Sequence, residues 1–498
     1  MKKLFNTTTQ LSIFHVLIFA SILMIIFPEL VIADIDVKKS VVKIFTVKTK
    51  SDYAKPWDKD SPKIISGSGC VINGNNILTN AHVVSDQTLI QVRQFGQATK
   101  HKARIVAISH ETDLALLTVD DNNFFKGIKP LPLGNLPEIQ QEVIVYGFPE
   151  GGDSLSITKG IISRIEHQKY VHSSKSFLTI QIDAAVNRGN SGGPVISNEF
   201  IVGVAMQNIK DAENINFIVP TPIINHFLTD LKDGKYDGFP EDGICIQSME
   251  NSGMKRRFGL KDGQTGGLVY YIMPGSPSEG IIKPKDIILS VDGHVIADDC
   301  TVEFRPDERT SCDYYTQQHQ FGENVIMEIL RDGKKQKVSI KLNRKSHDLI
   351  SRERYDLLPT YYIYGGLVFS PLTENYLKAW GEKWENDAPN NLMSLFSDGL
   401  PTTVDEQVII LSNVLPHNLN KGYQNLSECI ISEVNGQKIN NLKNMVHIIE
   451  KSTENSFVEF KTKKGIYIVL DRKAVEAAQD EILQLYDISI DRSPNLKS

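Results

Sequence analysis

The residues best suited to chemistry gather around Ser191, in the segment 188–195 (RGNSGGPV), where glycines stand on both sides of the serine. Glycines permit backbone conformations that side chains forbid, so this turn can direct the hydroxyl outward and several backbone N–H groups toward one point. A serine nucleophile served by an oxyanion hole requires that arrangement. Taken alone, the octet also fits a glycine-rich hairpin loop with a solvated serine.

A histidine and an aspartate upstream supply the two other groups that such a serine needs. His82 follows the short apolar run 76–79, and Asp113 stands immediately before the strongly apolar run 114–119. A single histidine is more often structural than catalytic, and an aspartate before a strand is commonly a turn residue. The order His, Asp, Ser is nevertheless one of those known for a catalytic triad, in which the histidine acts as base and the aspartate orients it.

Short apolar runs must position these residues. They extend from residue 41 to about 230 and are separated by Gly, Asn and Asp residues. Many short strands at near-regular spacing predict an all-β barrel or sandwich. The stretch 222–231 has apolar residues at helical spacing and predicts a helix that closes this unit. A segment rich in Gly, Asp and Pro at 232–242 marks a joint.

Two further units follow, and the second loosely repeats the plan of the first. The chain has 498 residues, and single cores stop growing beyond roughly 250–300 residues, so several domains are expected. The segment 266–270 (GGLVY) corresponds to 365–369 (GGLVF), and 287–293 (IILSVDG) corresponds to 430–436 (IISEVNG). A repeat of this size indicates duplicated domains rather than a solenoid. The region from 474 to 486 predicts a terminal helix.

Composition narrows the possible partners and the compartment. The formal net charge of −6 and the lack of a long Lys/Arg run give no reason to expect nucleic acid. An apolar run at 11–27 follows Lys2 and Lys3, and small or slender residues precede position 34. This pattern predicts a signal peptide over residues 1–33, with an uncleaved membrane anchor as the alternative. Either interpretation exports the rest of the chain, to the periplasm or outside the cell.

The cysteines predict no metal site. Their number is five, none forms a C-x-x-C pair, and their spacing fits no zinc site. Cys300 and Cys312 lie in one polar loop and could form a disulfide in an oxidising compartment, but two free thiols fit equally well.

Together the three catalytic motifs resemble the HtrA/Deg family of serine proteases. The segment around Pro56 and Trp57, the stretch 183–187 (DAAVN) and the long C-terminal unit are most similar to the plant-type Deg proteases. The resemblance implies a mainly β chain, with a chymotrypsin-like double β-barrel protease domain followed by two PDZ-like α/β domains. The implied boundaries are 34–235 for the protease domain, 240–345 and 350–475 for the PDZ-like domains, and 476–498 for a C-terminal helix and tail.

For the active site, the resemblance implies catalysis by His82 and Asp113 from the first barrel and Ser191 from the second, without metal or other cofactor. It implies an oxyanion hole formed by backbone N–H groups of Gly189, Asn190 and Ser191, and a specificity pocket near Ala205, Met206 and Asn216. Asn216 stands where the family more often has glycine, so the size of the pocket stays open. A small or medium aliphatic residue before the scissile bond is the default.

For the PDZ-like units, the resemblance implies binding of extended peptides. A PDZ domain adds the peptide as a strand to a sheet edge, beside a Gly-rich turn that binds the terminal carboxylate. The candidate residues are Gly266, Gly267 and Leu268; in the second unit a plain β-turn fits equally well. The implied assembly is a homo-oligomer, a trimer or a multiple of trimers, formed near the start of the protease domain. Trp57 there suits an interface, or else covers a barrel end.

The function predicted on this basis is ATP-independent hydrolysis of unfolded or damaged exported proteins by a serine endopeptidase, through an acyl-enzyme intermediate. One alternative is a chaperone or peptide-binding scaffold whose active site is rarely assembled. Another is a processing protease with a single partner. The presence of all three triad residues favours an enzyme.

Overall fold

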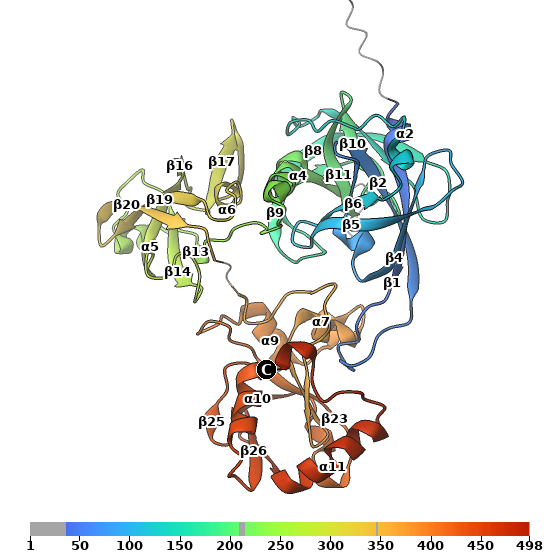
Figure 1. The fold of residues 1–498 in the computed structure, drawn as a ribbon. Coiled ribbons are helices and arrows are strands. Elements are labelled where there is room, and N and C mark those ends of the chain that lie inside the picture. The colour runs from blue at the N-terminus through green and yellow to red at the C-terminus, as the bar shows by residue number, and fades with distance from the viewer. Residues whose placement is uncertain (1–35, 209–214, 345–346, 498) are drawn as a thin grey trace, which may run out of the picture. The chain divides into compact units, whose positions relative to one another are not determined.

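The computed structural model describes residues 36–208, 215–344 and 347–497 (Figure 1). The predicted signal peptide or anchor at 1–33 lies outside the described residues. Among the helices that are described, none has the length and apolar character needed to cross a membrane.

The first barrel is closed, with its strands in the order β1-β2-β3-β6-β5-β4. Apolar side chains from all six strands fill its interior, and closure leaves no strand edge unpaired. The prediction of many short strands is confirmed. The elements of this part are α2 (Val37–Ser40), β1 (Val41–Lys48), β2 (Lys63–Ile72), β3 (Asn76–Thr79), α3 (Ala81–Val84), β4 (Gln87–Gln94), β5 (His101–Ser109), β6 (Leu114–Val119) and the 3-10 turn η1 (Asn122–Phe125).

The second barrel is also closed, in the order β10-β11-β12-β9-β8-β7. The predicted closing helix is confirmed, and it buries Ile223, Ile224 and Phe227. The elements are β7 (Glu142–Gly147), β8 (Ser156–Lys169), β9 (Ser176–Ile182), β10 (Pro194–Ser197), β11 (Phe200–Asn208), β12 (Asn216–Pro220), the helix α4 (Thr221–Asp230) and η2 (Leu231–Asp233).

The third unit is an antiparallel sheet in the order β13-β14-β15-β19-β20, with β16 paired to β15. A separate hairpin and the short helix α6 occupy the middle of the segment 298–320. The elements are β13 (Ile244–Gln247), α5 (Ser252–Phe258), β14 (Gly267–Ile272), β15 (Ile287–Val291), β16 (His294–Val295), the hairpin strands β17 (Thr301–Arg305) and β18 (Glu308–Ser311), α6 (Asp313–Thr316), β19 (Asn324–Arg331) and β20 (Lys334–Lys341).

The fourth unit has a sheet in the order β21-β22-β23-β24-β26-β27, with β25 paired to β24. Its helices are α7 (Glu374–Leu377), α8 (Trp384–Asp387), α9 (Asn390–Asp398), α10 (Leu442–Lys451) and α11 (Arg472–Leu485). Its strands are β21 (Tyr362–Tyr364), β22 (Leu367–Pro371), β23 (Ile409–Val414), β24 (Cys429–Val434), β25 (Gln437–Lys438), β26 (Phe457–Thr462) and β27 (Tyr467–Asp471). Four 3-10 turns complete it: η3 (Lys378–Trp380), η4 (Asn418–Asn420), η5 (Gln424–Leu426) and η6 (Pro494–Leu496).

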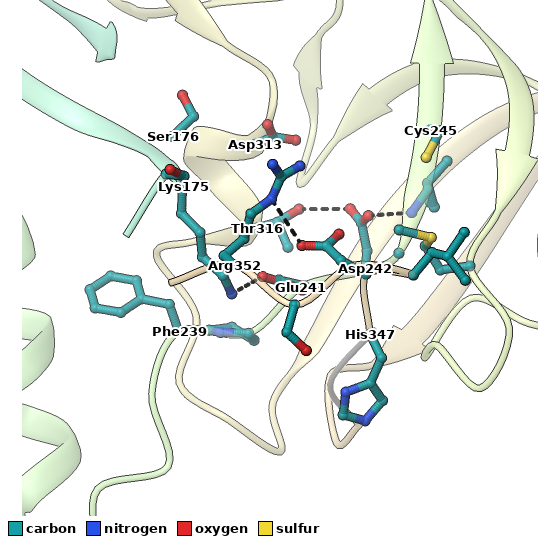
Figure 2. A pocket seen from close by; sticks show the side chains of 18 of the residues that line it. Lys175, Ser176, Phe239, Glu241, Asp242, Cys245, Asp313, Thr316, His347 and Arg352 are labelled. Atoms are coloured by element: carbon teal, nitrogen blue, oxygen red, sulfur yellow. Dashed lines mark hydrogen bonds and ion pairs between the residues drawn. The ribbon is translucent and has the colours of Figure 1, made fainter. Parts of the chain in front are cut away.

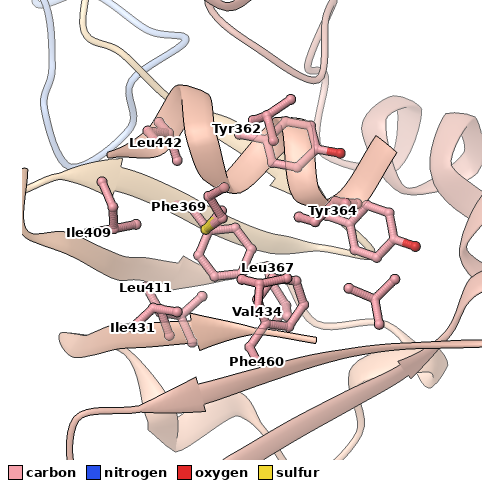
Figure 3. Packing of buried hydrophobic residues seen from close by; sticks show 14 of the residues in the cluster. Tyr362, Tyr364, Leu367, Phe369, Ile409, Leu411, Ile431, Val434, Leu442 and Phe460 are labelled. Carbon is pink, nitrogen blue, oxygen red and sulfur yellow. The ribbon is translucent and has the colours of Figure 1, made fainter. Parts of the chain in front are cut away.

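The core of the fourth unit joins its sheet to helix α10. Phe369 from β22 and Phe460 from β26 stack with their ring centroids 4.8 Å apart, and Leu442 of α10 packs in the same cluster (Figure 3). The terminal helix predicted from 474 to 486 is confirmed as α11. Its Val475 belongs to this core, so the helix packs on the unit that precedes it instead of forming a separate tail.

The repeat predicted from the sequence is visible in two hairpins. β15 and β16 are joined by Asp292 and Gly293, and β24 and β25 are joined by Asn435 and Gly436. All four turn residues have positive φ, between 48° and 85°. This is the conformation that a two-residue hairpin of type I′ requires, and it explains why both segments end in Asp-Gly or Asn-Gly.

Candidate active site

His82 and Asp113 meet at one end of the first barrel. The single helical turn α3 presents His82 directly after β3, and Asp113 precedes β6. The His82 ring nitrogen Nδ1 lies 2.7 Å from Asp113 Oδ2, and the His82 backbone N–H donates to Asp113 Oδ1 at 2.8 Å. The amide of Asn80 donates to the Asp113 carbonyl at 2.9 Å. The carboxylate therefore fixes both the ring and the backbone of the histidine.

Asp113 stays ionised although it is buried, with 1% of its surface exposed. Burial raises the pKa of the Asp113 carboxyl, but the electrostatic interaction with His82 and the hydrogen bonds from His82 outweigh that effect, so the pKa is lowered. A buried anion in contact with Nδ1 favours the tautomer that leaves Nε2 free to accept a proton.

The turn around Ser191 can exist only with glycine at positions 192 and 193. A Cβ on Gly192, which has φ of 84°, would lie 2.1 Å from the carbonyl oxygen of Ser68. A Cβ on Gly193 would lie 2.0 Å from the carbonyl oxygen of Tyr146. These close backbone approaches explain why the sequence needs small residues on the carboxyl side of the serine.

The Ser191 side chain is half-buried, and its hydroxyl donates to the Met206 carbonyl at 3.3 Å. No other hydrogen bond of this hydroxyl to a described residue is seen.

The direction of the Gly189 N–H, close to Ser191, follows from a hydrogen bond of the preceding carbonyl. The Arg188 carbonyl accepts a hydrogen bond from the Glu150 N–H at 2.7 Å. Because the C=O and the following N–H of a trans peptide point in opposite directions, the Gly189 N–H points away from Glu150. Within the described part of the chain, neither the Gly189 nor the Ser191 N–H has a backbone acceptor.

Asn190 departs from the expected oxyanion hole. Its N–H donates to the Asn187 carbonyl at 2.9 Å, so this donor is used inside the turn. Its side chain is buried, with 1% of its surface exposed. Of the three N–H groups predicted for the oxyanion hole, those of Gly189 and Ser191 have no backbone acceptor among the described residues.

Ser68 joins the two barrels at the turn around Ser191, and it was not predicted from the sequence. From β2 of the first barrel, its hydroxyl donates to the Gly189 carbonyl and accepts from the Phe148 N–H, both at 2.7 Å. Its backbone N–H donates to the Ser191 carbonyl at 2.8 Å. A signal was present in the segment 67–69 (GSG), since glycine inside a strand marks a close approach of backbones.

The residues expected near the specificity pocket lie on β11 and at the start of β12. Ala205 makes two backbone hydrogen bonds of 2.9 Å to the turn around Ser191: its carbonyl accepts from the Gly192 N–H, and its N–H donates to the Gly193 carbonyl. Met206 and Asn216 are buried, and the Asn216 amide donates to the Ala184 carbonyl at 2.9 Å. Their role in specificity stays a prediction.

The expected peptide-binding residues of the third unit are placed differently from the prediction. Gly267 and Leu268 lie on β14, which is paired with β13 on one side and β15 on the other. A Cβ on Gly266 would lie 2.7 Å from the Ile288 carbonyl. An added strand cannot pair with β14, because both of its edges are occupied. The free edges of this sheet belong to β13 and β20.

A pocket of about 640 Å³ lies beside edge strand β13 (Figure 2). Asp242 accepts hydrogen bonds from the Ile244 N–H at 2.9 Å and from the Thr316 hydroxyl at 3.2 Å. Burial and nearby Asp313 raise the pKa of Asp242 to about 7. The Lys175 ammonium pairs with Glu241 at 2.5 Å in the same wall.

The structure shows the surroundings of Trp57 and the state of Cys300 and Cys312. Trp57 is half-buried, and its ring contacts Tyr361 edge-on at a centroid distance of 6.1 Å, so it packs within its own chain. Cys300 and Cys312 are free thiols, as are the other three cysteines. The Cys312 N–H donates to the Cys300 carbonyl at 3.2 Å.

Comparisons with known proteins identify two protein families in the chain and relatives over most of its length. The family described as trypsin-like peptidase domain matches residues 67–204, and the PDZ domain family matches residues 350–495. Protease Do-like 4, mitochondrial, of Arabidopsis thaliana is 38% identical over 451 residues, covering 90% of this chain and 84% of that protein. Protease Do-like 2, chloroplastic, of the same plant is 35% identical over 469 residues, covering 93% and 76%.

Among solved structures, a variant of the HtrA-type protease AlgW with decapeptide has a TM-score of 0.50 and 21% identity. The match covers 62% of this chain and 95% of that chain. At this identity it supports the fold, a two-barrel peptidase domain followed by a PDZ domain.

Proposed function

The chain belongs to the HtrA/Deg family of serine proteases, and from this premise we propose that His82, Asp113 and Ser191 are its catalytic triad. The observation that carries the proposal is the contact of the His82 ring with a buried, ionised Asp113. The half-buried Ser191 lies on a turn whose carbonyl accepts a hydrogen bond from Ser68, in the barrel that carries both residues. His82 Nε2 takes the proton of Ser191 Oγ as the oxygen attacks the peptide carbonyl carbon.

The negative charge that develops on the carbonyl oxygen is stabilised by the N–H groups of Gly189 and Ser191. Loss of one such donor typically costs about 10²–10³ in rate. The C–N bond then breaks, and protonated His82 gives its proton to the leaving amine. Water, activated by His82, hydrolyses the acyl group from Ser191 and regenerates the enzyme.

The substrates that we propose are unfolded or damaged proteins, bound as extended chains without ATP. The solved structure of an HtrA-type protease with decapeptide supports peptide binding by this fold. The Arabidopsis relatives carry mitochondrial or chloroplastic names, which fits an exported protease that works inside a compartment. These names give no support to a periplasmic or secreted location.

The experiment is incubation of the purified mature chain with unfolded casein, beside Ser191→Ala. A fluorophosphonate probe should label the parent at Ser191, and casein should be cut. Both activities should disappear in the variant, while its circular dichroism stays unchanged. Labelling of another serine would contradict the assignment. Labelling of Ser191 with intact casein would instead favour the processing protease with a single partner.

A further inference from the structure

A segment far from the triad in sequence lies directly against the turn that carries the catalytic histidine. Asp86 ends this turn, four residues after His82. The Asp86 N–H donates to Asp356 Oδ1 at 2.5 Å, and the Asp356 N–H donates to Asp86 Oδ1 at 2.8 Å. Both aspartates have positive φ, 54° and 57°. Two turns with left-handed backbone are thus joined by a reciprocal pair of hydrogen bonds.

The same segment reaches a second histidine beside the triad. Asp356 Oδ2 lies 2.9 Å from His110 Nε2, and His110 Nδ1 lies 3.1 Å from His172 Nε2. The His172 ring centroid is 6.2 Å from that of His82. A chain of polar contacts therefore runs from Asp356 to the neighbour of the catalytic imidazole.

Tyr355 contacts His172 directly. Its ring stacks on the His172 ring with centroids 3.9 Å apart, and its hydroxyl donates to the His172 carbonyl at 2.7 Å. Both residues are buried, with 8% and 7% of their surfaces exposed. Burial lowers the pKa of His172 to about 3, so its ring is neutral at physiological pH.

The loop 170–175 lies between β8 and β9 and carries His172. It makes a further hydrogen bond to Glu374 of the fourth unit. The Ser174 hydroxyl donates to Glu374 Oε1 at 3.2 Å, and the other oxygen of Glu374 accepts from the Glu353 N–H at 3.1 Å. Contacts at His172 and Ser174 thus join the loop to the fourth unit and to the segment that leads into it. None of these residues belongs to the triad or its oxyanion donors.

We propose that Tyr355 and Asp356 are positioning residues, which hold His172 and the loop 170–175 against the His82–Asp113 pair in its productive geometry. The neutral, stacked His172 ring forms a rigid wall beside the catalytic imidazole and adds no competing charge. Efficient proton transfer from Ser191 to His82 then requires the segment 353–356 to pack against the loop 170–175. The inference rests on the proposed triad.

The test compares Tyr355→Ala, Tyr355→Phe and Asp356→Asn in the full chain, with Leu358→Ala as matched control. Leu358 lies in the same segment, and 57% of its surface is exposed. The readouts are kcat and KM on a short chromogenic peptide, and the rate of fluorophosphonate labelling at Ser191. A small misplacement of catalytic groups can cost up to about 10²-fold.

Tyr355→Ala should therefore lower kcat and the labelling rate together, by about 10- to 100-fold, with KM changed less than about twofold. Tyr355→Phe keeps the stacked ring and should recover most of the loss. Asp356→Asn should fall between them, and Leu358→Ala should match the parent. Normal kcat in Tyr355→Ala, or a loss confined to KM, would overturn the inference.

The controls separate the two proposals. A parent chain that fails to label at Ser191 contradicts the proposed function. A parent that labels, with Tyr355→Ala labelling equally fast, contradicts only the positioning role. If Tyr355→Ala does not fold, the Phe and Asn variants decide: parental kcat in Asp356→Asn overturns the proposal, and a loss at unchanged melting temperature supports it.

Discussion

Asp113 combines three properties that seldom coincide in one aspartate. It is buried, its backbone is left-handed with φ of 54°, and both of its carboxylate oxygens bind one histidine. Aspartate adopts the left-handed backbone more readily than most side chains do, and here hydrogen bonds around the residue hold it in place. The Asn80 amide on the Asp113 carbonyl is part of that fixation.

Replacement Asp113→Asn should lower kcat by about 10⁴-fold while the fold is kept, because an amide favours the wrong tautomer of His82. Steady-state kinetics at neutral pH measure it. Asp120→Asn, at an exposed ion pair with Arg104 on the same barrel, is the control and should behave like the parent. Near-normal turnover in Asp113→Asn would remove Asp113 from the triad.

Asp242 gives a pH dependence of stability. Its pKa is raised by burial from 3.8 to about 7, so the folded chain binds its proton more tightly than the unfolded chain does. The stabilisation is complete below about pH 4 and is lost as pH rises toward 7. Asp242→Asn should flatten this part of the profile in denaturant unfolding at pH 4.5 and 7.5. A parallel profile for parent and variant would show that Asp242 titrates normally.

His82, Asp113 and Ser191 are predicted as a triad from short motifs in the sequence, because their neighbouring residues indicate such chemistry. The residues that contact them could not be predicted. The supporting contacts join positions far apart: the Ser68 hydroxyl bond to Gly189 spans 121 residues, and the Tyr355 bond to His172 spans 183. Local composition carries almost no information on which distant side chain completes such a bond.

At the scale of the element, the turn around Ser191 depends on backbone contacts with strand β2 of the first barrel. A side chain at Gly192 would meet the carbonyl oxygen of Ser68 and the hydroxyl of Thr79, at 2.1 and 2.2 Å. These two oxygens are hydrogen-bonded to each other, because the Thr79 hydroxyl donates to the Ser68 carbonyl. Moving either one away from an added side chain would break this bond.

Gly192→Ala should therefore displace the turn and lower fluorophosphonate labelling by at least about 10²-fold, the cost of losing an oxyanion donor. Gly96→Ala is the matched control, because Gly96 also has positive φ, 73°, but has nothing within 4 Å of an added Cβ. It should lose only about 1 kcal/mol of stability from backbone strain. Equal activity of the two variants would mean that the turn adapts.

Strand order explains why the peptide-binding prediction failed at Gly267. The Gly-Gly-Leu segment looks like an exposed turn beside a strand, and the sequence does not tell which strand lies at the edge. The edge position of β13 depends on its pairing with β14, with a register shift between Cys245 and Ile246. Any peptide that extends this sheet must approach β13 or β20.

At the scale of the molecule, the strand pattern predicted β units but could not distinguish a barrel from a sandwich. Closure depends on the pairing of β1 with β4 and of β10 with β7, which no local pattern encodes. The family resemblance supplied the two barrels. The repeat between the third and fourth units was visible because its turns need Asp-Gly or Asn-Gly.

Assembly is open to a direct test at this scale. Trp57 packs on Tyr361 of its own chain, so Trp57→Ala should leave the mass in light scattering unchanged. Ile64 near the start of β2 has 78% of its surface exposed and is a better candidate for a contact between copies. Ile64→Lys should lower the mass if copies meet there. A fall in mass for Trp57→Ala alone would return the interface to the tryptophan.

The Ser68 bridge has a consequence for how activity appears during folding. The turn around Ser191 takes its shape from a hydroxyl and an amide that belong to the other barrel, so neither barrel can complete the site by itself. Domains of large proteins often fold as separate units before they dock. After dilution from denaturant, the β signal of the barrels should return first. Reactivity at Ser191 should follow with a lag, in a single step that coincides with the meeting of the two barrels.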